Sequence, residues 1–224
     1  EITSRLVGSE MCIRDRMSAG IAALESGANV LMLEKASEEL AGGNTKYTAG
    51  AMRFSYENSE ELLPLLSNPD DGRISRTDFG TYTKEKFSND LLDFNEGRPL
   101  SSEQTYLVSE SYDAVKWLAG HGVTYEPIYS RQSFEKDGKI IFWGGLALAA
   151  RDEGVGLYNM EAKTFKNLGG SIRFDAGVTE LLTSDQNVSG VIVGGEKYKS
   201  DAVILACGGF ESNNKLREEE IGLD

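Results

Sequence analysis

The chain mixes short apolar runs with amphipathic stretches, a pattern typical of proteins that combine strands and helices. Residues 17–27 are small and apolar and close with Gly27, so they predict a helix that stops at a glycine. Residues 29–33 (NVLML) follow as a continuous apolar run, which is typical of a strand buried on both faces. The first part of the chain therefore predicts a helix that leads directly into a buried strand.

The middle of the chain predicts mainly helices. Residues 37–58 are rich in Gly, Ser, Thr and Asn and lack a period, so we expect a loop or a loop with a short helix. Residues 75–95 have helical spacing behind a Ser or Thr cap, and SSEQTYLVSESYDAVKWLAGHG opens like a capping box and stops at Gly120. We also expect strands in VTYEPIY and KIIFW and a helix in GLYNMEAKTFKNLGG.

The tail contains three β-type runs, SIRFDAGVTELLTSD, VSGVIVGG and DAVILACGG, with turn residues between them. Together with the helix and strand near the start, these runs predict an α/β fold with a parallel sheet. NVLML and DAVILA are both continuous apolar runs, so we expect them to be neighbouring, doubly buried parallel strands.

An acidic residue, Glu34, closes the NVLML strand. In dinucleotide-binding units, a carboxylate at the end of the second strand binds the ribose hydroxyls, because it accepts two hydrogen bonds at once. A solvated charge at a strand end would have the same sequence position. The residue taken alone leaves both interpretations open.

Two glycine-containing segments favour a phosphate-bearing ligand. Small residues recur in AGGNTKYTAGAM, where they allow backbone N–H groups to approach a ligand closely and to form an anion-binding nest. The second segment, AVILACGGF, runs from an apolar strand directly into a Gly-Gly turn. An acidic strand end followed by these segments is more specific than an isolated glycine motif.

With these motifs the chain resembles the flavoprotein subunits of fumarate reductases and succinate dehydrogenases, through LMLEKA, AGGNTKYTAGAM and ILACGGF. Within that family, GGNTKYTAGAMRFS, ESYDAVKWLAGHGVTYE and RQSFEKDGKIIFWGG are most similar to FAD-dependent tricarballylate dehydrogenases. The resemblance implies a Rossmann-like FAD-binding domain over residues 17–224, with a parallel sheet and a helical insertion at about 57–121. It also implies that the chain is a fragment, truncated before the capping domain.

The resemblance implies how FAD is held. Glu34 binds the adenosine ribose, the GGNT segment wraps the pyrophosphate, and the TAGA segment lies along the isoalloxazine. Val178 contacts the adenine through its backbone, and the turn at residues 206–209 closes over the adenosine side. The implied cofactor-binding residues are Glu34, Lys35, Ala36, Gly42, Gly43, Asn44, Thr45, Thr48, Ala49, Gly50, Ala51, Val178, Ala206, Cys207, Gly208 and Gly209.

The implied FAD is not covalently attached. In respiratory succinate dehydrogenases a histidine carries the flavin, and the position that matches it here is Asn44. An amide nitrogen has no usable lone pair, so Asn44 can hydrogen-bond to a flavin but cannot form the covalent link.

The phosphate loop expected before residue 17 is missing from the sequence. Family members have approximately VIGGGNAG at this place, whereas residues 11–16 read MCIRDR. Bulky Arg14 and Arg16 prevent a close approach to pyrophosphate, and Asp15 adds like charge. We expect residues 1–16 to be a non-native leader, because SEMCIRDR is similar to translated sequencing-adapter sequence. Residues 1–10 should then be poorly packed, and residues 11–16 should not form a tight phosphate-binding turn. The rival interpretation is a divergent loop whose arginines bind the phosphates.

The resembled enzymes oxidise or reduce a C–C bond next to a carboxylate through hydride transfer at flavin N5. The resemblance therefore implies a small carboxylate substrate and an electron-transfer partner of unknown identity, with catalytic residues beyond residue 224. His121 at a helix end, Trp143 and Cys207 are expected to be structural, and Arg131 stays open. The alternatives are a non-redox or regulatory nucleotide- or flavin-binding module, an NAD-binding domain, and a ketosteroid-type dehydrogenase of the same family.

The composition limits which binding partners and which cellular compartment we expect for the protein. The 224 residues carry a net charge of −13, which disfavours nucleic acid and anionic membranes as partners. No apolar run approaches the ~20 residues of a membrane span. Two cysteines are too few for a disulfide framework, and no metal-binding pattern is present, so we expect a metal-free protein of the bacterial cytoplasm.

Overall fold

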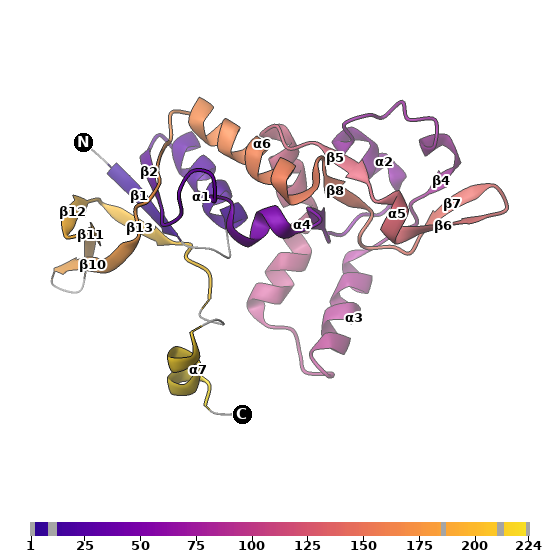
Figure 1. Ribbon diagram of the computed structural model, residues 1–224. Helices are drawn as coiled ribbons and strands as arrows, with labels where there is room; N and C mark the ends of the chain where they lie inside the picture. Colours follow the sequence, from indigo (N-terminus) through magenta and orange to yellow (C-terminus); the bar gives the residue numbers. More distant parts are fainter. Residues whose placement is uncertain (1–2, 9–12, 185–186, 210–212, 223–224) are drawn as a thin grey trace. The chain divides into compact units, whose positions relative to one another are not determined.

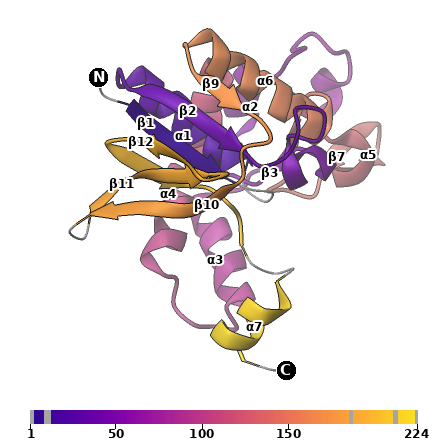
Figure 2. The ribbon, with the colours of Figure 1, turned by 60° about the vertical axis from the view of Figure 1, so that its left-hand side comes forward.

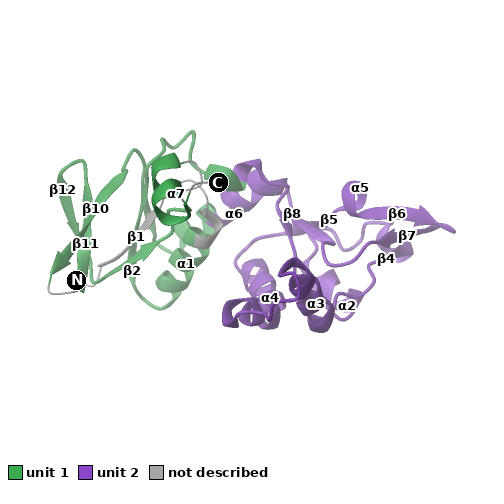
Figure 3. Ribbon diagram, turned by 90° about the horizontal axis from the view of Figure 1, so that it is seen from below, with its two compact units in different colours: residues 1–45, 162–224 green, residues 46–161 purple. Residues whose placement is uncertain are grey.

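The computed structural model describes residues 3–8, 13–184, 187–209 and 213–222. The chain divides into two compact units (Figure 3). The first unit comprises Glu1–Thr45 together with Ala162–Asp224, and the second unit comprises Lys46–Glu161. The segment expected as a helical insertion, residues 57–121, lies inside the second unit.

A four-stranded parallel sheet forms the centre of the first unit, with strand order β13-β1-β2-β9 (Figure 1). Its strands are β1 (Thr3–Gly8), β2 (Asn29–Glu34), β9 (Ser171–Arg173) and β13 (Ala202–Leu205). The predicted parallel sheet containing NVLML and DAVILA is thereby confirmed. The prediction that these two strands are neighbours is wrong, because β1 lies between them and pairs with both.

The strand β1 also differs from our expectation of a poorly packed leader. Residues 3–8 pair along their whole length with β2, and four of them pair with β13. Parallel pairing uses backbone N–H and C=O groups, which TSRLVG supplies at every position because it has no proline. Residues 9–12, which include part of the expected phosphate loop, lie outside the described residues. A foreign origin of residues 1–16 stays a prediction.

The helix after this segment is longer than predicted. Helix α1 (Ile13–Glu25) begins four residues before the expected start at residue 17. Met17 and Ile21, one helical turn apart, are 1% and 0% exposed, so this face of the helix is buried in the protein interior. The glycine stop is confirmed, because Gly27 follows the helix with a φ of +84°.

A second sheet completes the first unit, with antiparallel strands β10 (Val178–Ser184), β11 (Asn187–Val193) and β12 (Glu196–Lys199) (Figure 2). Its buried residues Val191, Val193 and Tyr198 form one cluster with Leu33 and Ala176. The sequence pattern did not predict strand β12, because EKYK contains a single apolar side chain. The short helix α7 (Asn214–Glu220) follows later in the chain.

Strand β13 is less buried than its apolar sequence suggested. Ile204 and Leu205 are 39% and 58% exposed, whereas we expected a strand buried on both faces. The reason is its place at the edge of the sheet, where β1 is its one neighbouring strand in the described part of the chain.

The second unit combines helices with two small sheets. Helices α3 (Lys84–Phe94) and α4 (Ser102–Gly120) contact each other, and the predicted capping box of α4 is confirmed, whereas the Ser or Thr cap of α3 lies later than the expected start at residue 75. Thr83 caps α3, and Ser101 forms a capping box with Gln104 at the start of α4. The helix expected from residue 75 starts later because Thr77 and Asp78 pair as β4 (Thr77–Asp78) with β7 (Lys139–Phe142).

The two small sheets have strand orders β3-β8-β5 and β4-β7-β6. A core rich in aromatic side chains, including Phe54, Tyr56, Phe79, Tyr82 and Tyr125, lies within this unit. The remaining elements are η1 (Gly43–Tyr47), β3 (Ala51–Met52), α2 (Ser59–Leu62), η2 (Leu63–Leu65), η3 (Ile74–Arg76), β5 (Tyr125–Pro127), α5 (Tyr129–Gln132), β6 (Ser133–Lys136), β8 (Leu148–Ala150) and α6 (Glu153–Asn167). Of these, η1 and α6 cross the boundaries between the units.

None of the helices in the described residues is long and apolar enough to cross a bilayer.

Gly50 offers a test of close backbone packing in the second unit. A Cβ at Gly50 would lie 2.7 Å from the carbonyl carbon of Glu153, whereas one at Gly80 would meet nothing within 4 Å. The two glycines have nearly equal φ values, +63° and +62°. We expect Gly80→Ala to cost about 1 kcal/mol through left-handed strain alone. Gly50→Ala should cost about 2–4 kcal/mol because the contact adds to that strain.

Urea denaturation of both variants measures this difference. Equal losses of unfolding free energy in the two variants would show that the backbone of Glu153 yields to the added methyl group.

Candidate functional site

Glu34 is buried at the end of β2 and forms an ion pair. Its side chain accepts a hydrogen bond of 2.6 Å from Nη2 of Arg16, and the two residues are 3% and 1% exposed. Arg16 also donates from Nη1 to the carbonyl oxygen of Leu33, at 3.4 Å. The interpretation of Glu34 as a solvated strand-end charge is therefore wrong, because both groups of the pair are removed from water.

The second carboxylate oxygen of Glu34 holds the chain that follows it. Oε1 accepts a hydrogen bond of 2.9 Å from the backbone N–H of Ala36. The carbonyl oxygens of Glu34 and Ala36 accept hydrogen bonds from the N–H groups of Ala176 and Asp175, at 2.8 and 3.0 Å. Two predicted site segments, residues 34–36 and the start of β10 at Val178, are thereby brought together.

The next segment of the first unit turns through two glycines. Gly42 and Gly43 have φ values of +121° and +42°, in the region where a side chain would be strained. Asn44 is exposed, whereas Thr45 is 8% exposed. This conformation explains why both positions are glycine, and it is compatible with a backbone that presents N–H groups to an anion.

Residues 48–51 belong to the second unit, where the segment packs against the start of α6. The carbonyl oxygen of Thr48 accepts from the N–H of Gly154 at 3.1 Å, and that of Gly50 accepts from Ala150 at 2.9 Å. Ala51 pairs with Ala149 in the adjacent strand. The close approach that requires Gly50 is thus a contact with the backbone of Glu153.

The last predicted segment follows β13. Ala206 is buried, Cys207 is exposed and takes part in no disulfide within the described residues, and Gly208 has a φ of +71°. Of the other residues singled out by sequence, His121 caps the end of α4 through a 2.7 Å contact of Nδ1 with the carbonyl oxygen of Trp117. Trp143 is 64% exposed, and its ring lies against that of Phe134 at a centroid distance of 4.6 Å and a tilt of 38°.

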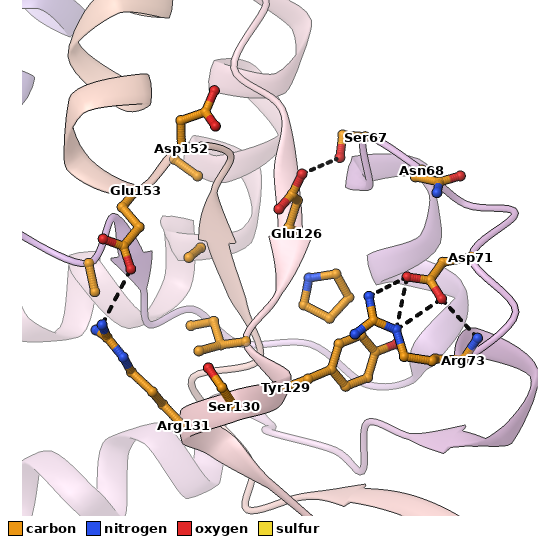
Figure 4. Close-up of a pocket in the computed structure, with 15 residues that line it drawn as sticks. Ser67, Asn68, Asp71, Arg73, Glu126, Tyr129, Ser130, Arg131, Asp152 and Glu153 are labelled. Carbon is orange, nitrogen blue, oxygen red and sulfur yellow. Dashed lines mark hydrogen bonds and ion pairs between the residues drawn. The ribbon is translucent and has the colours of Figure 1, made fainter.

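The second unit contains a cavity of about 490 Å³ (Figure 4). It is bounded by Ala49 of the TAGA segment, by α5 and the chain before it, and by the start of α6. Its charged lining residues are Asp71, Arg73, Glu126, Arg131, Asp152 and Glu153. Arg131, which the sequence left open, is therefore a cavity residue.

The sequence analysis missed the acidic residues of this cavity and the role of Arg16. Glu126 ends the segment ESYDAVKWLAGHGVTYE, which was used for the resemblance alone, Asp152 and Glu153 lie outside the quoted motifs, and the fold brings all three to one cavity. Within the described part of the chain, no three His, Cys, Asp or Glu residues are grouped so that they could hold a metal ion.

Comparison with known proteins identifies relatives of this arrangement. A family described as FAD binding domain matches residues 17–222. A fumarate reductase (cytochrome) of Shewanella frigidimarina is 28% identical over 204 residues, covering 88% of this chain and 32% of that protein. A urocanate reductase of Eggerthella lenta is 28% identical over 219 residues, covering 89% of this chain and 31% of that protein.

Among solved structures, the 3-ketosteroid-delta4-(5alpha)-dehydrogenase of Rhodococcus jostii matches with a TM-score of 0.67. The match covers 96% of this chain and 47% of that one at 19% identity, so it concerns the fold. The chain spans about a third of the length of the curated relatives that it matches. Because the family match includes nearly all of its residues, the chain belongs to the FAD binding domain family, and reductases of the fumarate reductase type are among its relatives.

Proposed function

We propose that the chain is the cofactor-binding part of an FAD-dependent oxidoreductase that acts on the C–C bond next to a carboxylate. Fumarate, succinate and tricarballylate represent the substrate class. The observation that supports this most is a buried carboxylate at the end of β2, followed by left-handed glycines, in a chain of the FAD binding domain family. An electron-transfer partner and a location in the bacterial cytoplasm are part of the proposal.

Two features of the described residues support FAD binding. Gly42 and Gly43 have left-handed φ values, which suit a backbone that binds a pyrophosphate, and residues 34–36 are hydrogen-bonded to Asp175 and Ala176, just before β10. Arg16 acts against this fit. Its guanidinium and the ribose hydroxyls would compete for the same oxygen of Glu34.

In this proposal each segment has a binding task. Glu34 accepts hydrogen bonds from the ribose hydroxyls, the backbone N–H groups at residues 42–44 face the pyrophosphate, and residues 48–51 line the isoalloxazine edge. FAD, when bound, supplies the centre that exchanges a hydride with the substrate carbon. We assign proton transfer to residues that follow residue 224 in a longer protein.

The proposal is tested by anaerobic reduction of the flavin in a full-length relative that contains this segment. Bleaching of the flavin by succinate or tricarballylate, or reoxidation of reduced flavin by fumarate, is the expected result. A flavin that responds neither to these three acids nor to a carboxylic acid that carries a cationic group would contradict the proposal, and a response to a ketosteroid alone would favour the ketosteroid-type activity.

Arg16→Gln is expected to raise the affinity of the chain for FAD about tenfold, because a neutral amide competes less for the Glu34 carboxylate than a guanidinium does. Glu34→Gln should lower the affinity, since the ribose hydroxyls lose a charged acceptor. Titration of intrinsic fluorescence with FAD measures both effects.

The matched control is Lys166→Gln, which removes the exposed Lys166–Glu38 pair of the same unit and should change nothing. Thermal melting must first show that Arg16→Gln is folded, because loss of one partner leaves Glu34 buried with less compensation. Weaker FAD binding by a folded Arg16→Gln variant would instead favour the rival interpretation, in which arginines bind the phosphates.

FAD is expected to be released on denaturation, because the exposed amide of Asn44 cannot attach the flavin covalently. The test is acid precipitation of a flavin-loaded full-length relative that carries this segment, followed by filtration through a small-pore membrane. Yellow colour in the filtrate is the expected result, and colour retained with the protein would contradict the prediction.

A further inference from the structure

The two arginines of the cavity in the second unit are held very differently (Figure 4). Arg73 is held by several hydrogen bonds to one carboxylate. Its side chain donates to both carboxylate oxygens of Asp71, at 2.5, 3.0 and 3.1 Å, and it lies over the ring of Tyr129 at 4.2 Å. These hydrogen bonds lower the pKa of Asp71 to about 2. The Arg73–Asp71 pair therefore contributes little net charge to the cavity.

Arg131 is held loosely. Among the described residues its one ion pair joins Nη2 to Oε1 of Glu153 at 3.4 Å, and the two side chains are 60% and 62% exposed. Exposed pairs of this kind contribute little stability. A ligand carboxylate that accepts two parallel hydrogen bonds from the guanidinium can therefore displace Glu153 easily.

The remaining charged side chains of the cavity are mostly acidic. Besides the Arg73–Asp71 pair, its lining contains the carboxylates of Glu126, Asp152 and Glu153 and the guanidinium of Arg131, while Arg151, which is not a lining residue, forms an ion pair with Glu126. Glu126 makes only long contacts, at 3.4 Å to Ser67 and 3.7 Å to Arg151. Asp152 makes no side-chain hydrogen bond or ion pair with the residues that the structure describes. Once a ligand binds Arg131, Glu153 becomes a further uncompensated carboxylate.

The backbone at this acidic edge is strained. Asp152 and Glu153 have φ values of +61° and +57°, which side chains adopt only at a cost. A Cβ at Gly156 would lie 1.8 Å from the carbonyl oxygen of Arg151, so this tight conformation excludes a side chain at residue 156. The chain therefore presents two adjacent carboxylates at the start of α6 in a conformation that local preference does not favour.

We propose that this cavity binds a small carboxylic acid that also bears a cationic nitrogen group. Its carboxylate lies on Arg131, and its cation faces Asp152 and Glu153. The inference rests on the proposed function, because Ala49 joins the cavity to the TAGA segment at the isoalloxazine. It narrows the carboxylate substrates to acids that carry a cationic group, in place of the di- and tricarboxylates named there. A dicarboxylate fits poorly, since its second carboxylate would meet like charge.

Three probes of similar size test this charge requirement. β-Alanine and succinate both carry a carboxylate on a two-carbon chain, and they differ in having an ammonium or a second carboxylate at the other end. Propionate carries neither. In ligand-observed NMR titrations of the 224-residue chain without FAD, we expect β-alanine to bind about tenfold more tightly than succinate, with propionate between them.

Variants show which side chain of the cavity binds which group of the ligand. Arg131→Gln should weaken the binding of β-alanine and propionate about tenfold, and Asp152→Asn should weaken β-alanine while leaving propionate unchanged. The matched control is Arg76→Gln, which removes the exposed Arg76–Glu135 pair of the same unit and does not line the cavity. Thermal melting establishes that each variant is folded, and Arg131→Lys replaces Arg131→Gln if the latter is not.

Succinate binding as tight as that of β-alanine, no saturable binding of any probe, or equal effects of the Arg131 and Arg76 variants would each overturn the proposal. Because FAD is absent from these titrations, their outcome is separate from that of the FAD-binding experiment, which tests the proposed function.

Discussion

The buried ion pair between Arg16 and Glu34 is the interaction on which the first unit depends. It joins the first turn of α1 to the end of β2, and both side chains are almost completely removed from water. Loss of one partner from such a pair typically costs about 3–5 kcal/mol, because the other charge stays buried. Removal of either partner alone would therefore weaken the packing of α1 on the sheet.

Under the proposed function, the same pair places folding and cofactor binding in competition. A ribose that binds Glu34 would replace the hydrogen bond from Arg16, whose guanidinium also donates to the carbonyl oxygen of Leu33. The resembled family has a glycine-rich loop at this place, and a glycine at residue 16 would leave the carboxylate to the ligand.

In the second unit, the start of α6 shapes both the TAGA segment and the cavity. Its backbone packs against Gly50 so closely that a side chain there is excluded, and its first residues supply carboxylates to the cavity. The TAGA segment is therefore constrained by protein contacts on one side, independently of any ligand. The start of α6 therefore contacts the segment expected at the isoalloxazine edge and also supplies charge to the cavity that Ala49 lines.

The sequence by itself determined the local features of this protein. Apolar runs predicted β2, the glycine at residue 27 predicted the end of α1, and Ser101 predicted the capping box of α4, because each depends on neighbouring residues. The motifs around Glu34, Gly42 and Gly43 likewise indicated the family. These features required no knowledge of distant contacts.

The tertiary structure decided what depends on pairing across the chain. Strand β1 pairs with β2 and with β13 through backbone hydrogen bonds, which cannot be predicted from its side chains. Strand β13 lies at the edge of the sheet, and its side chains Ile204 and Leu205 are exposed. The ion pair of Arg16 with Glu34 joins residues that no motif connects. The charge of the cavity likewise arises from segments far apart in sequence, so only folding could bring Arg131, Glu126 and Asp152 to one site.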